Sequence, residues 1–107
     1  MADKLHWLYQ FKPGEARPDL ATNAAAWTET DERVFTAHYE RLRQGAEDGI
    51  VILAGRSQDG IGPAIVIFEA DSEEAARRFM EEDPFVSEGL FTADLHPFRA
   101  ALVRKTE

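Results

Sequence analysis

The chain has 107 residues, a formal net charge of -8, 44% hydrophobic residues, 30% charged residues and no cysteine. This length suits one domain over residues 1–107, and the acidic charge disfavours nucleic acid and anionic membranes as partners, which leaves a small molecule or another protein. The lack of cysteine excludes disulfides and thiolate chemistry, no apolar run is long enough for a membrane helix, and the start MADKLHWLYQF is no signal peptide, so we expect a cytoplasmic protein.

The first predicted element is a β-strand over residues 4–11, in which apolar residues alternate onto one face. That face carries Leu5, Trp7, Tyr9 and Phe11. Such a row is typical of a core or a dimer interface. A connection over residues 12–30 follows, with two prolines and a glycine. Connections of this length are often functional lids, and we expect Trp27 to pin this one down.

A helix is predicted over residues 31–49, with Thr30 as its N-cap and Gly49 as its C-terminal stop. Its predicted apolar stripe consists of Val34, Phe35, His38, Leu42 and Ala46. Two strands, over residues 50–56 and 64–70, are apolar on both faces. The turn-rich segment between these strands predicts a hairpin.

A second helix is predicted over residues 71–83, capped by Asp71 or Ser72. Its predicted inner stripe consists of Ala75, Ala76, Phe79 and Met80. The segment PFVSEGL indicates a short extra turn or helix. The last strand is predicted over residues 91–103, where Pro97 is typical of an edge position or a bulge.

The element order β-α-β-β-α-β predicts an α+β, ferredoxin-like fold, in which two helices cover one face of a four-stranded antiparallel sheet. Because the second and third strands are apolar on both faces, the second face of the sheet would be an unusually large exposed patch. We therefore expect a homodimer that packs face to face through a two-fold axis. The alternative cover for this face is the long connection with Trp27.

Two segments resemble the YciI-like (YCII-related) family, namely AHYERLRQGAEDGIVILAG and AIVIFEADSEEAARRFMEEDPFVSEGLFTADLHPF. The order and spacing of several short motifs carry the resemblance from about His38 to Phe98, and the opening strand also fits. These motifs are His38, Gly49, Ala54-Gly55, Ser72 with Glu74-Ala75-Ala76, Asp83-Pro84-Phe85, Gly89 and Pro97-Phe98.

The resemblance implies a dimeric α+β barrel and a catalytic pair formed by His38 and Asp83, without an organic cofactor. One relative in this family is a 5-chloro-2-hydroxyhydroquinone dehydrochlorinase, and muconolactone isomerase shares the fold. Both reactions transfer protons on small cyclic compounds. The chain departs from the family pattern at Phe35, where a basic residue is common, at Arg56, which replaces a proline, and in its longer first connection.

His38 and Asp83 also have explanations that involve no chemistry. A histidine on the apolar stripe of a helix can be a core residue that is hydrogen-bonded to a backbone carbonyl. An aspartate before proline is a common helix N-cap. The second explanation is compatible with a functional role, because a capping carboxylate is held rigidly and could orient an imidazole.

A metal site is not expected. The only histidines are His6, His38 and His96, and no two of them have the helical i, i+4 or strand i, i+2 spacing of metal ligands. No serine lies in a nucleophile motif.

Two functional hypotheses follow. The first is a cofactor-independent enzyme in which His38 is the general acid/base and Asp83 orients it, in a lyase, isomerase or dehydrochlorinase step on a small cyclic or aromatic compound. It predicts that both side chains lie in one pocket, within hydrogen-bond reach. The alternative is a non-catalytic dimeric module that binds a small ligand or a protein. A cofactor-free monooxygenase is a third candidate, based on analogy of fold.

Overall fold

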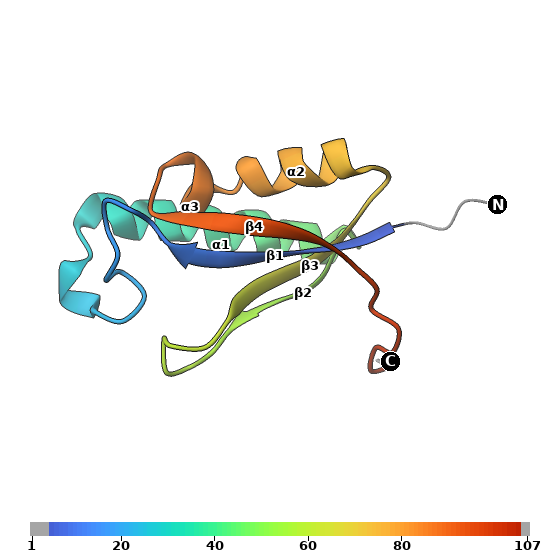
Figure 1. Cartoon of the computed structure of the whole chain (residues 1–107), viewed down its shortest axis with the longest axis horizontal. Helices are drawn as coiled ribbons and strands as arrows, with labels where there is room; N and C mark the ends of the chain where they lie inside the picture. The colour runs from blue at the N-terminus through green and yellow to red at the C-terminus, as the bar shows by residue number, and fades with distance from the viewer. Residues whose placement is uncertain (1–4, 106–107) are drawn as a thin grey trace.

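The structure, a computed structural model, describes residues 5–105 (Figure 1). The predicted start of the first strand at residue 4 lies outside the described residues. The elements are β1 (Leu5–Pro13), η1 (Ala24–Ala26), α1 (Glu29–Glu47), β2 (Val51–Arg56), β3 (Ala64–Ala70), α2 (Glu73–Glu81), α3 (Pro84–Ser87) and β4 (Phe91–Phe98).

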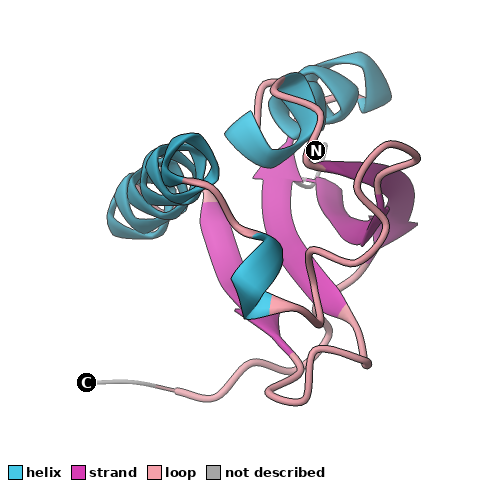
Figure 2. Ribbon diagram, turned by 90° about the vertical axis from the view of Figure 1, so that its left-hand side faces the viewer, coloured by secondary structure: helices cyan, strands magenta, loops and turns pink. Residues whose placement is uncertain are grey.

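The four strands form one antiparallel sheet in the order β2-β3-β1-β4. Figures 1 and 2 show α1 and α2 side by side on one face of this sheet. The ferredoxin-like α+β fold that the element order predicts is therefore confirmed. β4 pairs with β1 alone, so Pro97 lies on an edge strand, as its type predicts. Within residues 5–105, no helix is long and apolar enough to cross a membrane.

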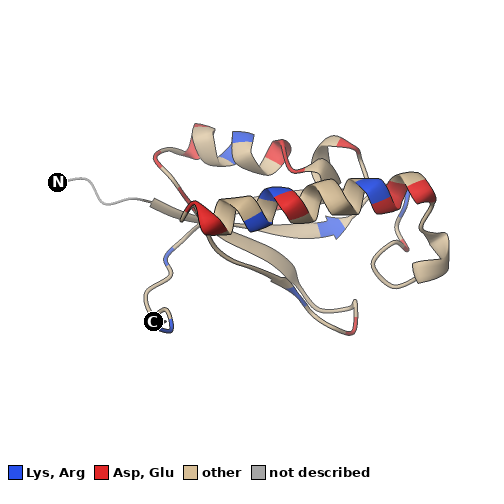
Figure 3. Ribbon diagram, turned by 180° about the vertical axis from the view of Figure 1, so that it is seen from behind, with Lys and Arg blue, Asp and Glu red and all other residues tan. Residues whose placement is uncertain are grey.

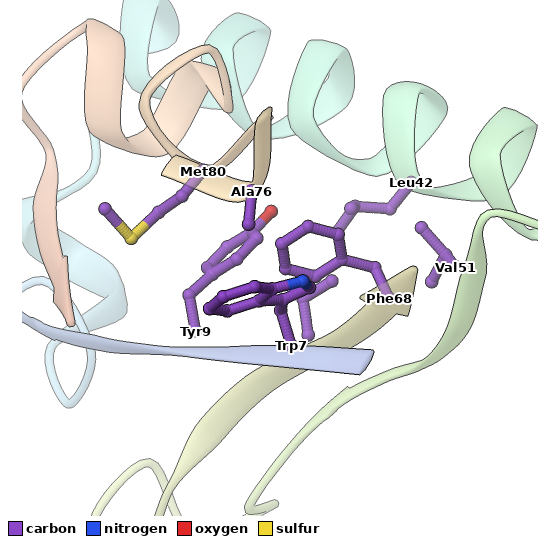
Figure 4. Close-up of a cluster of buried hydrophobic side chains, with 8 residues drawn as sticks. Trp7, Tyr9, Leu42, Val51, Phe68, Ala76 and Met80 are labelled. Atoms are coloured by element: carbon purple, nitrogen blue, oxygen red, sulfur yellow. The ribbon is translucent and has the colours of Figure 1, made fainter. Parts of the chain in front are cut away.

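The main core lies between the sheet and the two helices. Trp7 and Tyr9 of β1 pair with Phe68 and Val66 of β3, and all four side chains are buried against the helix layer. Figure 4 shows Leu42 of α1 and Met80 of α2 reaching down onto these rings. The predicted inward row of the first strand is thus part of the core, except that Leu5 at its end is exposed.

The ends of α1 show how local chemistry sets its length. Its N-cap is Thr28, not Thr30, and the Thr28 side chain and Asp31 form a reciprocal capping box. The helix begins two residues earlier than predicted because only Thr28 has an acidic residue at the N3 position that can return the hydrogen bond. Gly49 ends the helix as predicted, with a φ of 81°, a left-handed conformation that suits glycine.

The buried stripe of α1 is rotated relative to the prediction. Phe35 and Ala46 are exposed, whereas Leu42 and Gly45 are buried. At Gly45 a Cβ would lie 2.8 Å from Cγ2 of Val51, so the glycine allows α1 to approach β2 closely. The stripe predicted for α2 is confirmed, since Ala76 and Met80 are buried.

The open face of the sheet is of mixed character. Leu8 pairs with Ile67 and His96 on this face, and Leu53 and Phe98 are 50% and 41% exposed. The outer faces of the helices carry both charge signs, as Figure 3 shows for α1 and α2. Trp27 of the long connection packs beside the helix-side cluster that contains Phe85 and not on the open face.

Candidate active site

The position of Asp83 in the site is set by the backbone between α2 and α3. α2 ends just before it, and the extended conformation of Asp83 (φ -62°, ψ 126°) is the one that a following proline favours. Its Oδ1 accepts a hydrogen bond from the backbone N–H of Phe85 at 3.0 Å, and Pro84 occupies the first turn of α3. The predicted capping role is confirmed.

His38 of α1 lies directly against this carboxylate. Its Nδ1 is 2.8 Å from Oδ1 of Asp83, although the two residues are 45 positions apart. The Asp83 side chain is fully buried and that of His38 is 12% exposed. The predicted hydrogen-bond contact between the two side chains is therefore confirmed. His38 Nδ1 contacts this carboxylate and not a backbone carbonyl, which was the alternative explanation.

A third side chain completes the contacts of Asp83. The hydroxyl of Tyr9, which is fully buried in β1, donates to Oδ2 of Asp83 at 2.7 Å. Burial, and then the Asp83 charge and hydrogen bond, raise the pKa of Tyr9 far above its usual range, against a smaller opposing effect of Arg41. Tyr9 is thus a phenol that donates.

The donors around Asp83 determine the tautomer of His38. The Phe85 N–H and the Tyr9 O–H each donate to one carboxylate oxygen, so both oxygens of Asp83 act as acceptors. His38 Nδ1 then carries the proton that is shared with Oδ1. The lone pair of Nε2 is left as the reactive position of the ring, which suits a general base.

Aromatic rings surround His38. The ring of Phe85 stacks on the imidazole, with centroids 3.9 Å apart and planes 14° apart. Phe11 and Phe35 lie 5.6 Å and 6.2 Å from the imidazole centroid. These faces provide an apolar setting for the neutral ring and a favourable cation–π contact for its protonated form.

Arg41 lies one turn beyond His38, on the same side of α1. Its Nη2 donates to the Phe79 carbonyl at 2.9 Å, and the guanidinium lies 4.2 Å above the Phe79 ring. Its Nη1 is buried and has no hydrogen-bond partner among the described residues. A cation is therefore held near the inner end of the Tyr9 side chain.

A cavity of about 830 Å³ lies next to this group, between the long connection and the loop from β2 to β3. Its aromatic wall consists of Phe11, Trp27, Phe35, Phe85 and Phe91. Neither His38 nor Asp83 lines this cavity. For this cavity, the prediction that one pocket contains both side chains is therefore wrong. Phe35 and Phe85 form the boundary, because they contact the cavity on one side and the imidazole on another.

The long connection is fixed over the cavity by two contacts. The indole N–H of Trp27 donates to the Leu20 carbonyl within the connection at 2.8 Å, and its ring lies 6.1 Å from that of Phe85, which confirms the predicted pinning role. The Arg17 guanidinium binds both carboxylate oxygens of Asp31 at 3.1 Å and 2.6 Å. Because Asp31 is also part of the helix cap, the loop and α1 share one anchor.

The other histidines lie away from the pair. His6 of β1 accepts a hydrogen bond from the Ala100 N–H, and His96 is on the open face of β4. The described residues contain no group of three or more histidine and acidic side chains that could hold a metal ion.

Three contacts at the site were not predicted from the sequence: those of Tyr9, Arg41 and Phe85. The available signal was at Tyr9, since a phenol within an inward apolar row needs a polar partner when it is buried. No local pattern names that partner, which lies 74 positions away.

Comparison with protein families places the chain. The YCII-related domain family matches residues 8–98, most of its length. The chain belongs to the YCII-related family. A comparison with curated protein sequences finds no match.

One solved structure of similar fold is the 5-chloro-2-hydroxyhydroquinone dehydrochlorinase from Burkholderia phenoliruptrix, in complex with 2,5-dihydroxybenzoquinone. The TM-score is 0.58 with 21% sequence identity, and the match covers 88% of this chain and 93% of that chain. This likeness supports the ferredoxin-like fold of the YCII-related chain.

Proposed function

We propose that this protein is a cofactor-independent acid/base enzyme that transfers a proton on a small cyclic or aromatic compound. His38 is the general acid/base through Nε2, and Asp83 orients it through Nδ1. The observation that carries the proposal is the 2.8 Å contact between His38 and a fully buried carboxylate that is fixed by two further donors. A fixed buried carboxylate of this kind selects one imidazole tautomer and stabilises the imidazolium that forms during proton transfer.

The Burkholderia enzyme supports the choice of reaction class, because it has a similar fold and is named as a dehydrochlorinase. In such a step, on a non-aromatic keto form of the ring, Nε2 would remove a proton from an sp³ ring carbon, and the C–H electron pair would form a new double bond to the neighbouring carbon. Chloride would leave the neighbouring carbon with the electrons of its bond. The imidazolium, stabilised by Asp83, would then release its proton to solvent. An isomerase would instead return that proton to another ring carbon.

We place the substrate in the aromatic cavity. Its wall suits a flat ring, and two cationic side chains, Lys12 and Arg56, line it. Lys12 is paired with Asp94, whereas Arg56 has no ion-pair partner among the described residues and could bind a ring oxyanion. Because Phe35 is exposed, its side chain can turn aside to bring the ring to His38.

The second candidate function, a non-catalytic binding module, is favoured by one observation. The cavity is lined by neither residue of the pair, so a ligand could bind in it without reaching His38. Binding and turnover therefore have to be measured together.

We also propose that the protein is a homodimer in which the open faces of two sheets pack together. The exposed side chains of Leu53 and Phe98, with Leu8 and Ile65 between them in the sheet, support this arrangement. A two-fold pairing would cover the same patch on both copies.

The test is an assay of chloride release and absorbance change with chlorinated hydroxyhydroquinones and hydroxylated quinones. We expect turnover by the wild type, a loss of roughly 100-fold or more in His38→Gln, and no loss in His96→Gln, the matched control on the open face. Ligand binding without turnover, unchanged by His38→Gln, would contradict the enzyme and support the binding module.

A further inference from the structure

The inference concerns Tyr9, a buried titratable residue that the proposed proton transfer does not use directly. The side chain of Tyr9 has one hydrogen-bonding group, its hydroxyl. This hydroxyl points from β1 toward the helix layer (Figure 4). It meets Oδ2 of Asp83 at 2.7 Å. The opposite oxygen of the same carboxylate meets His38.

We propose that Tyr9 is a positioning residue of the His38–Asp83 pair, which acts through the carboxylate and sets how strongly Asp83 binds the imidazole. This inference rests on the proposed function of the pair. Tyr9 does not line the cavity, and its hydroxyl bonds to the Asp83 carboxylate and not to His38, so it is not a catalytic residue in the proposed reaction.

The first argument is geometric. The backbone N–H of Phe85 and His38 Nδ1 both bind Oδ1, so those two contacts hold the carboxylate through one oxygen only and leave its rotation about the Cβ–Cγ bond opposed at that oxygen alone. The Tyr9 hydroxyl holds Oδ2, and Tyr9 is itself fixed by ring contacts with Phe68 and Phe11. A carboxylate held at both oxygens presents Oδ1 to His38 in one orientation.

The second argument is electrostatic. The Tyr9 O–H and the His38 Nδ1–H donate to the same anion, and each donor draws charge that the other would otherwise receive. Arg41 adds a positive charge at the inner end of the same group. Because burial keeps Tyr9 protonated, it remains a donor throughout the working pH range. Tyr9 therefore weakens the His38–Asp83 hydrogen bond relative to a site without it.

This opposition between two donors can be tested by NMR without any substrate. The measured quantity is the chemical shift of the His38 Nδ1–H proton, together with the ¹⁵N shifts that report the tautomer. In Tyr9→Phe, which keeps the ring and removes the hydroxyl, we expect the Nδ1–H resonance to move to lower field, because the hydrogen bond to Asp83 strengthens. Tyr39→Phe is the matched control, since it removes the hydroxyl of the exposed neighbour of His38.

A second arm keeps the test informative if Tyr9→Phe does not fold. The chain has two tyrosines, so in the Tyr39→Phe background 3-fluorotyrosine can be incorporated at Tyr9 alone. The fluorinated phenol is a stronger donor, and we expect the His38 resonance to move to higher field, opposite to its movement in Tyr9→Phe. Equal His38 resonances in all three proteins would overturn the role of Tyr9. Because no turnover is involved, failure of the enzyme assay would leave this result unaffected.

Discussion

At the scale of single residues, Asp83 combines a structural and a proposed chemical role. It caps α3, accepts from Tyr9, and contacts His38, while its side chain is fully buried. A cap needs only one of these contacts. The additional contacts explain why a carboxylate is placed inside the core, where an uncompensated charge would be costly.

This network predicts an unequal cost for the removal of two N-caps. Asp83→Ala should lower the free energy of unfolding by about 3 kcal/mol, because it leaves buried donors of Tyr9, Phe85 and His38 without a partner. Ser72→Ala, which removes the exposed cap of α2, should cost only about 1 kcal/mol. Urea denaturation measures both values, and equal losses would show that the Asp83 network adds nothing to the cap.

At the scale of elements, the long connection is tied to the start of α1. Arg17 binds Asp31, and Asp31 also accepts from the Thr28 N–H. The Arg17 hydrogen bonds, followed by the Thr28 backbone contact, hold the pKa of Asp31 well below its usual range. The capping box and the loop anchor thus depend on the same carboxylate.

The lowered pKa of Asp31 predicts how stability depends on pH. A carboxylate whose folded pKa lies below its unfolded value of about 3.9 contributes stability above that value, and this contribution is lost as the pH falls further. The difference in unfolding free energy between wild type and Asp31→Asn should be constant from about pH 7 to 5 and should shrink below about pH 4. Urea denaturation at each pH checks this, and a difference that is the same at pH 7 and pH 3 would contradict it.

The cavity loops make contact at Gly60, and this contact gives a further prediction. Gly60 has a φ of 74°, and a Cβ there would lie 2.5 Å from the Ala21 carbonyl oxygen. Gly89 has a φ of 79° and nothing within 4 Å of its Cβ position, so Gly89→Ala is a matched control for the backbone cost, about 1 kcal/mol. Gly60→Ala should cost more than Gly89→Ala and speed amide hydrogen exchange at Asn23, which bonds to Asp19 in the long connection. Equal effects of the two variants would show that the loops do not support each other.

At the scale of the whole molecule, both helices cover one face of the sheet and leave the other face open (Figure 2). The proposed dimer would cover that face, and Leu53 is its most informative residue because it is half exposed on the edge strand β2, where it pairs with Ile67 of β3. The His38–Asp83 pair lies on the helix side of the sheet, so its geometry does not depend on the dimer.

The dimer predicts a specific effect of charge on the open face. Leu53→Asp should weaken self-association by roughly 30-fold, since loss of a large apolar contact and burial of a charge cost about 2 kcal/mol at an interface. Tyr39→Asp, on the outer side of α1, should leave association unchanged. Analytical ultracentrifugation over a range of concentrations measures both. A wild type that sediments as one chain at all concentrations would contradict the dimer.

The parts of this fold that could be predicted from sequence are those set by neighbouring residues. Asp83-Pro84 determines a cap, Gly49 ends a helix, and alternation over residues 5–11 gives a strand. Thr28 and Thr30 could not be told apart by type alone, because the choice depends on the side chain three positions later. Contacts between segments that are distant in the sequence could not be predicted in this way. The bond between Tyr9 and Asp83 follows from the packing of β1 against the α2–α3 junction, which no short pattern encodes.

The most direct test of the proposed acid/base pair is the exchange of a ring C–H proton of 2,5-dihydroxybenzoquinone with D₂O, followed by NMR. This exchange needs a general acid/base but no leaving group, so it isolates the step assigned to His38 and Asp83. We predict that the wild type accelerates the exchange, and that His38→Gln and Asp83→Asn each reduce the acceleration by roughly 100-fold or more, while His96→Gln retains it. An exchange rate with the wild type equal to that with His38→Gln would contradict the account.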